Sequence, residues 1–344
     1  MPLEITVRQS NQLKSIAILM MLCLHLFNRD YKGLFDPILF IANKPLVYYI
    51  SLFCDACVPI FAFVSGYGLY YKYLQNRTVF AMDNLIRLKK LYINYWIILL
   101  IFPVTIGLIL QFPGYPGSWD KFVFNFLGVN TNYNGAWWFF TVYVFFLLTS
   151  RLWFSILDNF NAILVFIILI GIYFLAFYFR VYKAHLFESL FLNFLQSQLS
   201  NFFCTLFQFM LGAFALKYKW NNIVSSYFKN IQHKKILISV FILMLVIFHS
   251  IIPNFVVAPF TALGFIFVYC QMDISKKNQK IIDFFTPHST NIWLIHMFIY
   301  LTFFRTFIYS FKYPVIIFFV LVLICVLCSF FINFINKIVQ KSIL

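Results

Sequence analysis

Long apolar segments dominate this sequence and limit the folds that it can adopt. Runs of about 20 mostly apolar residues recur along it, and this is the length that an α-helix needs to cross the hydrocarbon core of a bilayer. The pattern predicts an all-α, polytopic integral membrane protein with about ten transmembrane helices. The predicted spans are 11–28, 46–71, 91–112, 136–156, 160–180, 199–216, 235–251, 254–271, 289–309 and 313–335.

The composition excludes an ordinary soluble protein. Of the 344 residues, 63% are hydrophobic, 22% are aromatic and only 10% are charged, whereas soluble domains carry about 25% charged residues. The spans use up the length, so we expect 1–344 to form a single transmembrane domain without an appended soluble domain. The charged Asn28-Arg29-Asp30 follows the first span where a signal peptide would have small residues, which indicates that this span is retained.

Basic residues indicate the topology. The 26 Lys and Arg exceed the 10 Asp and Glu, but the cations lie in the loops and not on one soluble face, so we expect no nucleic-acid partner. With the N-terminus inside, 18 of the 26 cations fall on the cytoplasmic side. The positive-inside rule therefore predicts that both termini are cytoplasmic.

Lys14 and His25 are the two ionisable side chains of the first span. They are 11 positions apart, which on a helix returns them to within about 20° of one face and separates them by about 16 Å. Only 15–27 is mostly apolar, so the helix must extend back through polar residues such as Gln12. The spacing indicates a buried path with a charged mouth. The alternatives are an interfacial lysine that snorkels and a histidine that is merely hydrogen-bonded in the bundle.

The second span carries two further unusual features. Asp55 is the only acid deep in an apolar run, and an unpaired carboxylate at that depth would be protonated or matched to a cation. Ser65 and Gly66 interrupt an otherwise bulky helix and permit close approach by a helix or a ligand. For this pair, plain helix packing is the simpler interpretation.

Arg87 and Lys90 are three positions apart at the cytoplasmic entry to the third span and share a helix face. Arginine binds phosphate in a bidentate manner and lysine acts as a point charge, so the pair is a candidate phosphate site. The alternative is an ordinary positive-inside flank. In the ninth span, Ser289, Ile292 and His296 fall on one face.

Other polar or aromatic residues receive simpler interpretations. Cys54 and Cys57 have a spacing used in zinc sites, as do Cys325 and Cys328, but all four lie in spans, where small buried hydrophobes are the simpler interpretation; we expect no metal. Trp137 is interpreted as part of an interfacial aromatic belt together with Trp138. No role is assigned to His185, His233, His249 or His288.

Taken together, these motifs resemble the membrane-bound acyltransferase-3 family, bacterial multi-span proteins that transfer acyl groups to cell-surface sugars. The resemblance covers essentially the whole chain. It rests on a basic residue, ten residues and a histidine in the first helix, and on three later motifs. The matching residues are Lys14 and His25; Pro59, Phe61, Phe63, Ser65, Gly66 and Tyr67; Arg87 and Lys90; and Ser289, Ile292, Trp293, Leu294 and His296.

The resemblance implies the chemistry. It implies an acyl-CoA donor, with acetyl-CoA the first expectation, that enters from the cytoplasm, and an acceptor hydroxyl on a cell-surface polysaccharide or lipid-linked sugar. The expected location is the inner membrane of a bacterium, with no permanently bound cofactor. The donor-binding residues would be Lys14, Ser65, Arg87 and Lys90, and the catalytic residues His25, His296 and Asp55.

The roles of the catalytic candidates remain open at this stage. His25 would act as general base or carry the acyl group covalently. Asp55 would orient an imidazole or pair with a cation, and His296 would assist proton transfer or line the donor site. The main rival function is a transporter or flippase for lipid-linked sugars, which would use the same buried polar residues as a pathway. A third alternative is a non-catalytic membrane protein for assembly or sensing.

Overall fold

The computed structural model describes residues 4–343, and the described chain is almost entirely helical. Eight of its helices are long and apolar enough to cross a membrane. They are Val7–Phe27, Leu46–Gln75, Phe80–Ile109, Gly135–Asn159, Ala162–Val181, Leu190–Lys217, Lys234–Ile251 and Pro314–Ser342. The all-α, polytopic membrane fold is therefore confirmed.

The two remaining predicted spans correspond to shorter helical elements. The span predicted at 254–271 is the apolar helix α12 (Ala258–Cys270), and the one predicted at 289–309 is divided among α14 (Ser289–Met297), the π-helical η5 (Phe298–Phe303) and α15 (Arg305–Tyr309). The total of ten spans and the cytoplasmic position of both termini stay predictions.

The remaining elements follow the same order along the chain. They are α1 (Val7–Phe27), β1 (Phe40–Ile41), β2 (Lys44–Pro45), α2 (Leu46–Phe53), η1 (Cys54–Ala56), α3 (Cys57–Gln75), α4 (Phe80–Leu99), η2 (Leu100–Ile106), α5 (Gly107–Ile109), α6 (Trp119–Phe126), η3 (Gly135–Trp137), α7 (Trp138–Asn159), α8 (Ala162–Val181), α9 (Leu190–Lys217), α10 (Trp220–Phe228), α11 (Lys234–Ile251), α13 (Lys276–Phe284), η4 (Thr286–His288) and α16 (Pro314–Ile343). The short strands β1 and β2 form an antiparallel hairpin.

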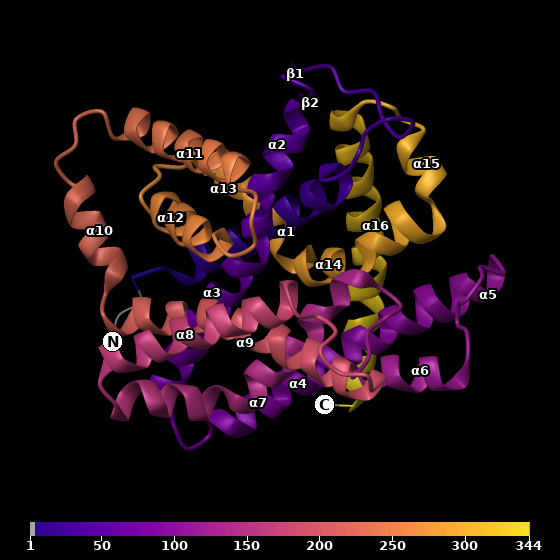
Figure 1. The fold of residues 1–344 in the computed structure, drawn as a ribbon, viewed down its shortest axis with the longest axis horizontal. Helices are drawn as coiled ribbons and strands as arrows, with labels where there is room; N and C mark the ends of the chain where they lie inside the picture. Colours follow the sequence, from indigo (N-terminus) through magenta and orange to yellow (C-terminus); the bar gives the residue numbers. More distant parts are fainter. Residues whose placement is uncertain (1–3, 344) are drawn as a thin grey trace.

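Helix α1 begins well before its apolar part. A capping box fixes its start, because Gln9 N donates to Thr6 Oγ1 (3.1 Å) while Thr6 N donates to Gln9 Oε1 (2.9 Å). The extension through Gln12 that the short apolar run predicted is thus confirmed, and Gln12 itself is buried against protein. Figure 1 shows α1 in the middle of the bundle, where it packs against α3 and α14.

Two glycines bring α3 and α9 into close contact at the centre of the protein. A Cβ atom added at Gly66 would lie 1.8 Å from Phe209 O, and one added at Gly212 would lie 2.0 Å from Phe63 O. No side chain fits at either position, so the backbones cross in direct contact. Of the Ser65-Gly66 pair, the glycine therefore serves helix packing.

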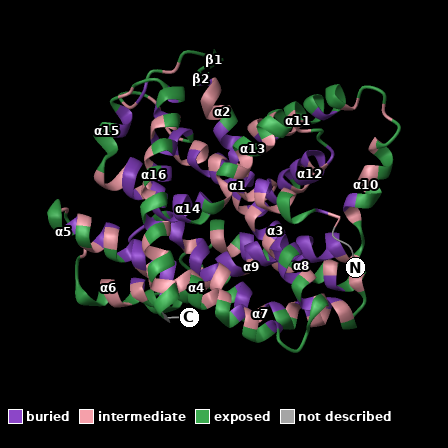
Figure 2. Ribbon diagram, turned by 180° about the vertical axis from the view of Figure 1, so that it is seen from behind, coloured by how far each residue is buried: buried purple, intermediate pink, exposed green. Residues whose placement is uncertain are grey.

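The outer helices expose the apolar side chains that a membrane protein presents to lipid. Figure 2 shows the buried residues gathered in α1, α3, α9 and α14, whereas α11 and much of α16 are exposed. Exposed residues such as Leu243, Phe319 and Leu323 are apolar, as expected for surfaces that contact hydrocarbon.

Candidate active site

Two histidines from opposite ends of the chain meet in the interior. His25 lies in the last turn of α1 and His296 lies in α14, and the distance from His25 Nδ1 to His296 Nε2 is 2.8 Å. The two rings are nearly parallel, with an interplanar angle of 12° and centroids 5.0 Å apart. The helices α1 and α14 thus bring together the two histidines that the sequence proposed as catalytic.

The surrounding hydrogen bonds assign the tautomers of the pair. His296 Nδ1 is 2.8 Å from Trp293 O and 3.1 Å from Ile292 O. Carbonyl oxygens only accept, so His296 Nδ1 carries a proton and, in the neutral ring, Nε2 is an acceptor. His25 Nδ1 then donates to His296 Nε2. This leaves the lone pair on His25 Nε2, which is the form that a general base requires.

Helix α14, which carries His296, is held by polar groups on both of its sides. Asn94 Nδ2 donates to Asn291 Oδ1 (2.8 Å), and Asn291 Nδ2 donates to Ser329 Oγ of α16 (2.9 Å). On the other side, Trp137 Nε1 donates to Leu294 O (2.8 Å). These bonds satisfy buried polar groups and fix the height and rotation of α14.

The interpretation of Trp137 as an interfacial aromatic is wrong. Its side chain is completely buried, with 0% exposure, and its indole N–H is used up by the backbone of α14. Trp138, the next residue, is partly exposed. A buried indole needs a hydrogen-bond acceptor, and the carbonyl of Leu294 supplies it.

A cavity of about 240 Å³ lies beside His25, at the end of the bundle that the predicted topology places outside. We call it the outer cavity. Its polar lining consists of His25, Asn28, Arg29, Asp55 and His249. Asp55 therefore shares a cavity with His25, which its depth in the second span alone did not establish.

A second cavity, also of about 240 Å³, lies toward the predicted cytoplasmic side; we call it the inner cavity. Lys14, Ser65 and Arg87 line it, together with Ser289 and Thr290. Three of the four predicted donor-binding residues therefore come together around one space.

Lys90, the fourth predicted donor-binding residue, lies elsewhere. It is exposed on α4 and is not part of the inner-cavity lining. Arg87 is turned inward because Arg87 Nη1 donates to Asn84 Oδ1 (2.6 Å), while Asn84 Nδ2 donates to Leu147 O of α7 (2.9 Å). The three-residue spacing thus places Arg87 and Lys90 on adjacent but different surfaces.

The histidine pair stands between the two cavities along α1. Met21 lines the inner cavity, and His25, one helical turn later, lines the outer cavity. On α14, likewise, Trp293 lines the inner cavity and His296 follows it by three positions. A group entering from one side and a group entering from the other would meet at the imidazoles.

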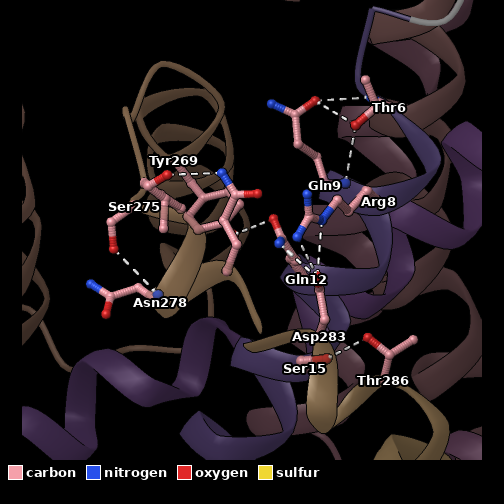
Figure 3. A network of polar contacts seen from close by, with 12 residues as sticks. Thr6, Arg8, Gln9, Gln12, Ser15, Tyr269, Ser275, Asn278, Asp283 and Thr286 are labelled. Atoms are coloured by element: carbon pink, nitrogen blue, oxygen red, sulfur yellow. Dashed lines mark hydrogen bonds and ion pairs between the residues drawn. The ribbon is translucent and has the colours of Figure 1, made fainter. Parts of the chain in front are cut away.

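The cytoplasmic end of α1 is tied to α13 by polar contacts. Arg8 and Gln12 both donate to the carboxylate of Asp283, at 2.6 and 2.8 Å, and Tyr269 Oη donates to Gln12 Oε1 at 2.9 Å (Figure 3). The Arg8 guanidinium lowers the pKa of Asp283 below its usual range. These contacts anchor the helix that carries Lys14 and His25.

A comparison with protein families decides the family of this protein. The model of the acyltransferase-3 family, described as an acyltransferase domain, matches residues 7–334, nearly the whole chain. The chain belongs to the acyltransferase-3 family. This acyltransferase is thus a multi-pass membrane enzyme, and the resemblance noted from its motifs is confirmed. Searches of curated proteins and of solved structures found no match.

Two residues of the acyltransferase site were missed in the sequence. His249, in the last turn of α11, was assigned no role, and Arg29, just after α1, was counted only as a charge on the outer side. One sign was available for Arg29. A cation beside a membrane span on the outer side runs against the positive-inside rule. Nothing in the sequence distinguishes His249 from the other loop and span-end histidines.

Proposed function

We propose that this acyltransferase moves an acyl group, acetyl in the simplest case, from cytoplasmic acyl-CoA to a hydroxyl of a cell-surface polysaccharide or lipid-linked sugar. The inner membrane of a bacterium is the location that fits this reaction. The observation that carries the proposal is the arrangement of a cationic inner cavity and a polar outer cavity on the two sides of the His25–His296 pair.

The inner cavity is suited to the donor. Coenzyme A carries phosphates on its nucleotide end, and Lys14 and Arg87 supply two cations there. An arginine held in place by Asn84 is a good phosphate ligand, because its fork of N–H groups matches phosphate oxygens. The pantetheine arm would then extend along α1, past Met21, toward His25.

His25 is suited to the chemical step as a general base. Its Nε2 lone pair would take the proton of the acceptor hydroxyl as the hydroxyl oxygen attacks the thioester carbonyl. His296, through the 2.8 Å hydrogen bond to His25 Nδ1, would hold the ring in the active tautomer. General base catalysis of this kind contributes roughly 10²- to 10⁴-fold in rate.

The outer cavity is suited to a sugar. Asp55, His249 and Asn28 offer hydrogen-bonding groups of several kinds around a space of about 240 Å³, which matches the dense hydroxyl groups of a carbohydrate. His249 is oriented by Thr261, whose Oγ1 lies 3.1 Å from His249 Nδ1. A bulky polysaccharide would present one sugar unit to this cavity.

Acetyl-CoA binding to the purified protein in detergent tests the proposal without knowledge of the acceptor. A ligand at 100 times its dissociation constant stabilises the folded state by about 2.7 kcal/mol, which a thermal unfolding assay detects. Arg87→Ala should lose this stabilisation. Lys89→Ala removes an exposed cation two positions away on the same helix and should keep it.

A second assay follows the acyl group itself. Membrane vesicles containing the protein should transfer radiolabelled acetyl groups from acetyl-CoA into the glycan fraction. If neither acetyl-CoA nor longer acyl-CoAs stabilise the wild-type protein, the proposal fails and a transporter or flippase becomes the favoured function.

A further inference from the structure

Arg29 occupies an unusual position beside the histidine pair. It follows α1 directly, and its side chain turns back along the helix so that Arg29 Nη2 donates to the backbone carbonyl oxygen of His25. The same nitrogen lies 3.4 Å from Tyr300 Oη, and the guanidinium carbon lies 5.4 Å from the centre of the Tyr300 ring. Three contacts thus fix a permanently charged group at the wall of the outer cavity.

One N–H group of this guanidinium has no acceptor. Arg29 Nε is buried and makes no hydrogen bond within residues 4–343. Across the same residues no ion pair joins Arg29 to a carboxylate, although Asp55 lines the same cavity. A buried charged donor without an acceptor costs free energy, so such groups are retained where an acceptor arrives during function.

Neither membrane topology nor packing accounts for an arginine at position 29. Topology does not call for a cation there, because the residue lies on the predicted outer side. A packing role would be filled by an apolar side chain over Tyr300 without leaving a buried Nε–H unpaired. What the position offers is positive charge and a free donor beside the base.

Building on the function proposed above, we propose that Arg29 is a catalytic residue that stabilises the oxyanion formed during acyl transfer. As the acceptor oxygen bonds to the thioester carbonyl carbon, its proton passes to His25 Nε2 and the carbonyl electron pair moves onto oxygen. The free donors of Arg29 face that negative charge. When the tetrahedral intermediate collapses, the C=O bond reforms, the C–S bond breaks, and the coenzyme A sulfur leaves and takes the proton from His25.

This assignment gives Arg29 and His25 separate tasks. His25 handles the proton, and Arg29 handles the charge that develops on the carbonyl oxygen, where a donor already in place needs no reorganisation. Because Arg29 is hydrogen-bonded to the carbonyl of His25 itself, the two groups keep a fixed relation. The oxyanion forms whichever hydroxyl attacks, water included, so the native acceptor is not needed for the test.

The test measures coenzyme A release from acetyl-CoA by the purified protein in detergent, with water and with a panel of methyl pyranosides as acceptors. Arg29→Ala should lower the turnover number by roughly 10²- to 10³-fold, the usual loss when an oxyanion donor is removed. The KM for acetyl-CoA and the thermal stabilisation by acetyl-CoA should not change. Arg29→Lys should retain more activity than Arg29→Ala, and millimolar ethylguanidinium should partly restore Arg29→Ala.

Arg305→Ala is the matched control, because Arg305 is an exposed arginine on the same predicted side and does not line the outer cavity. Its turnover should equal that of the wild type. Undiminished turnover in Arg29→Ala would overturn the assignment. So would a raised KM for the pyranoside at full turnover, which would make Arg29 a ligand for an acidic or hydroxyl-rich acceptor, or loss of acetyl-CoA stabilisation, which would make it structural.

Failure of the proposed function would look different. In that case the wild-type protein itself would show neither stabilisation by acyl-CoA nor coenzyme A release, and the role of Arg29 would fall with it. If the wild type binds and turns over acetyl-CoA while Arg29→Ala does so equally well, only the assignment of Arg29 falls.

Discussion

His25 Nδ1 and His296 Nε2 are 2.8 Å apart, although their residues are separated by 271 positions in the chain. The contact closes the bundle around one point, since α1 and α14 come from its first and ninth predicted spans. It also orders the two imidazoles. His296 is fixed by backbone carbonyls, and His25 keeps the free lone pair.

His25→Ala should lower transfer by roughly 10²- to 10⁴-fold, because the general base is lost while the donor-binding residues remain. Transfer of labelled acetyl groups in membrane vesicles measures this. The variant should still insert in the membrane and bind acetyl-CoA. His185→Ala, in an exposed loop, is the control. An inserted His25→Ala protein with full activity would remove His25 from the mechanism.

Asn84→Ala should weaken acetyl-CoA binding by about tenfold, because the hydrogen bond that orients the Arg87 guanidinium is worth about 1.5–3 kcal/mol when one partner is charged. The KM for acetyl-CoA in the coenzyme A release assay measures the effect. In the Arg87→Ala background the same substitution should add nothing, since the group that it orients is gone. Independent, additive effects would show that Asn84 acts only through packing against α7.

Gly66→Ala should destabilise the protein severely. The new Cβ would lie 1.8 Å from Phe209 O, so α3 and α9 would have to move apart at their closest crossing. Gly68→Ala is a matched control on the same helix, because nothing lies within 4 Å of a Cβ there. Thermal unfolding in detergent and the yield of folded protein compare the two. Equal behaviour would mean that the crossing can relax.

Asp283 makes stability depend on pH in the acid range. Its pKa is lowered in the folded protein by Arg8, so its contribution is fully present above the unfolded-state pKa, near 3.8. The contribution is lost as the pH falls below that value through the folded-state pKa. Asp283→Asn should therefore be less stable than the wild type at pH 7, and the difference should shrink toward pH 3. Thermal unfolding across this range measures it; a constant difference would contradict a stabilising role for the ion pair.

The overall fold was predictable because hydropathy and helix length are local properties. The predicted span 46–71 corresponds to the observed Leu46–Gln75, and the predicted 160–180 to Ala162–Val181. The short apolar run around His25 correctly required a helix start near Val7, since a membrane span has a minimum length. The split of the ninth predicted span near Phe304 was not predictable from hydropathy, which does not record a change of helix type.

The site was predictable only in part, because a single sequence carries no information on which distant residues meet. Spacing on one helix gave the relation of Lys14 to His25, but the contact of His25 with His296 depends on how α1 packs against α14. The shared face of Arg87 and Lys90 was too coarse, because neighbouring positions on one face differ in burial where the helix borders both protein and lipid headgroups. Asp55 was recognisable as costly, but its neighbours were not.

Within residues 4–343, the inner and outer cavities have no lining residue in common. An enzyme with substrates on the two sides of a membrane would short-circuit the proton gradient if its substrate spaces joined into a water-filled pore. With the cavities separate, only a chemical group needs to cross. Coenzyme A can stay and be recharged in the compartment where acyl donors are made, and the membrane keeps its electrical insulation during every turnover.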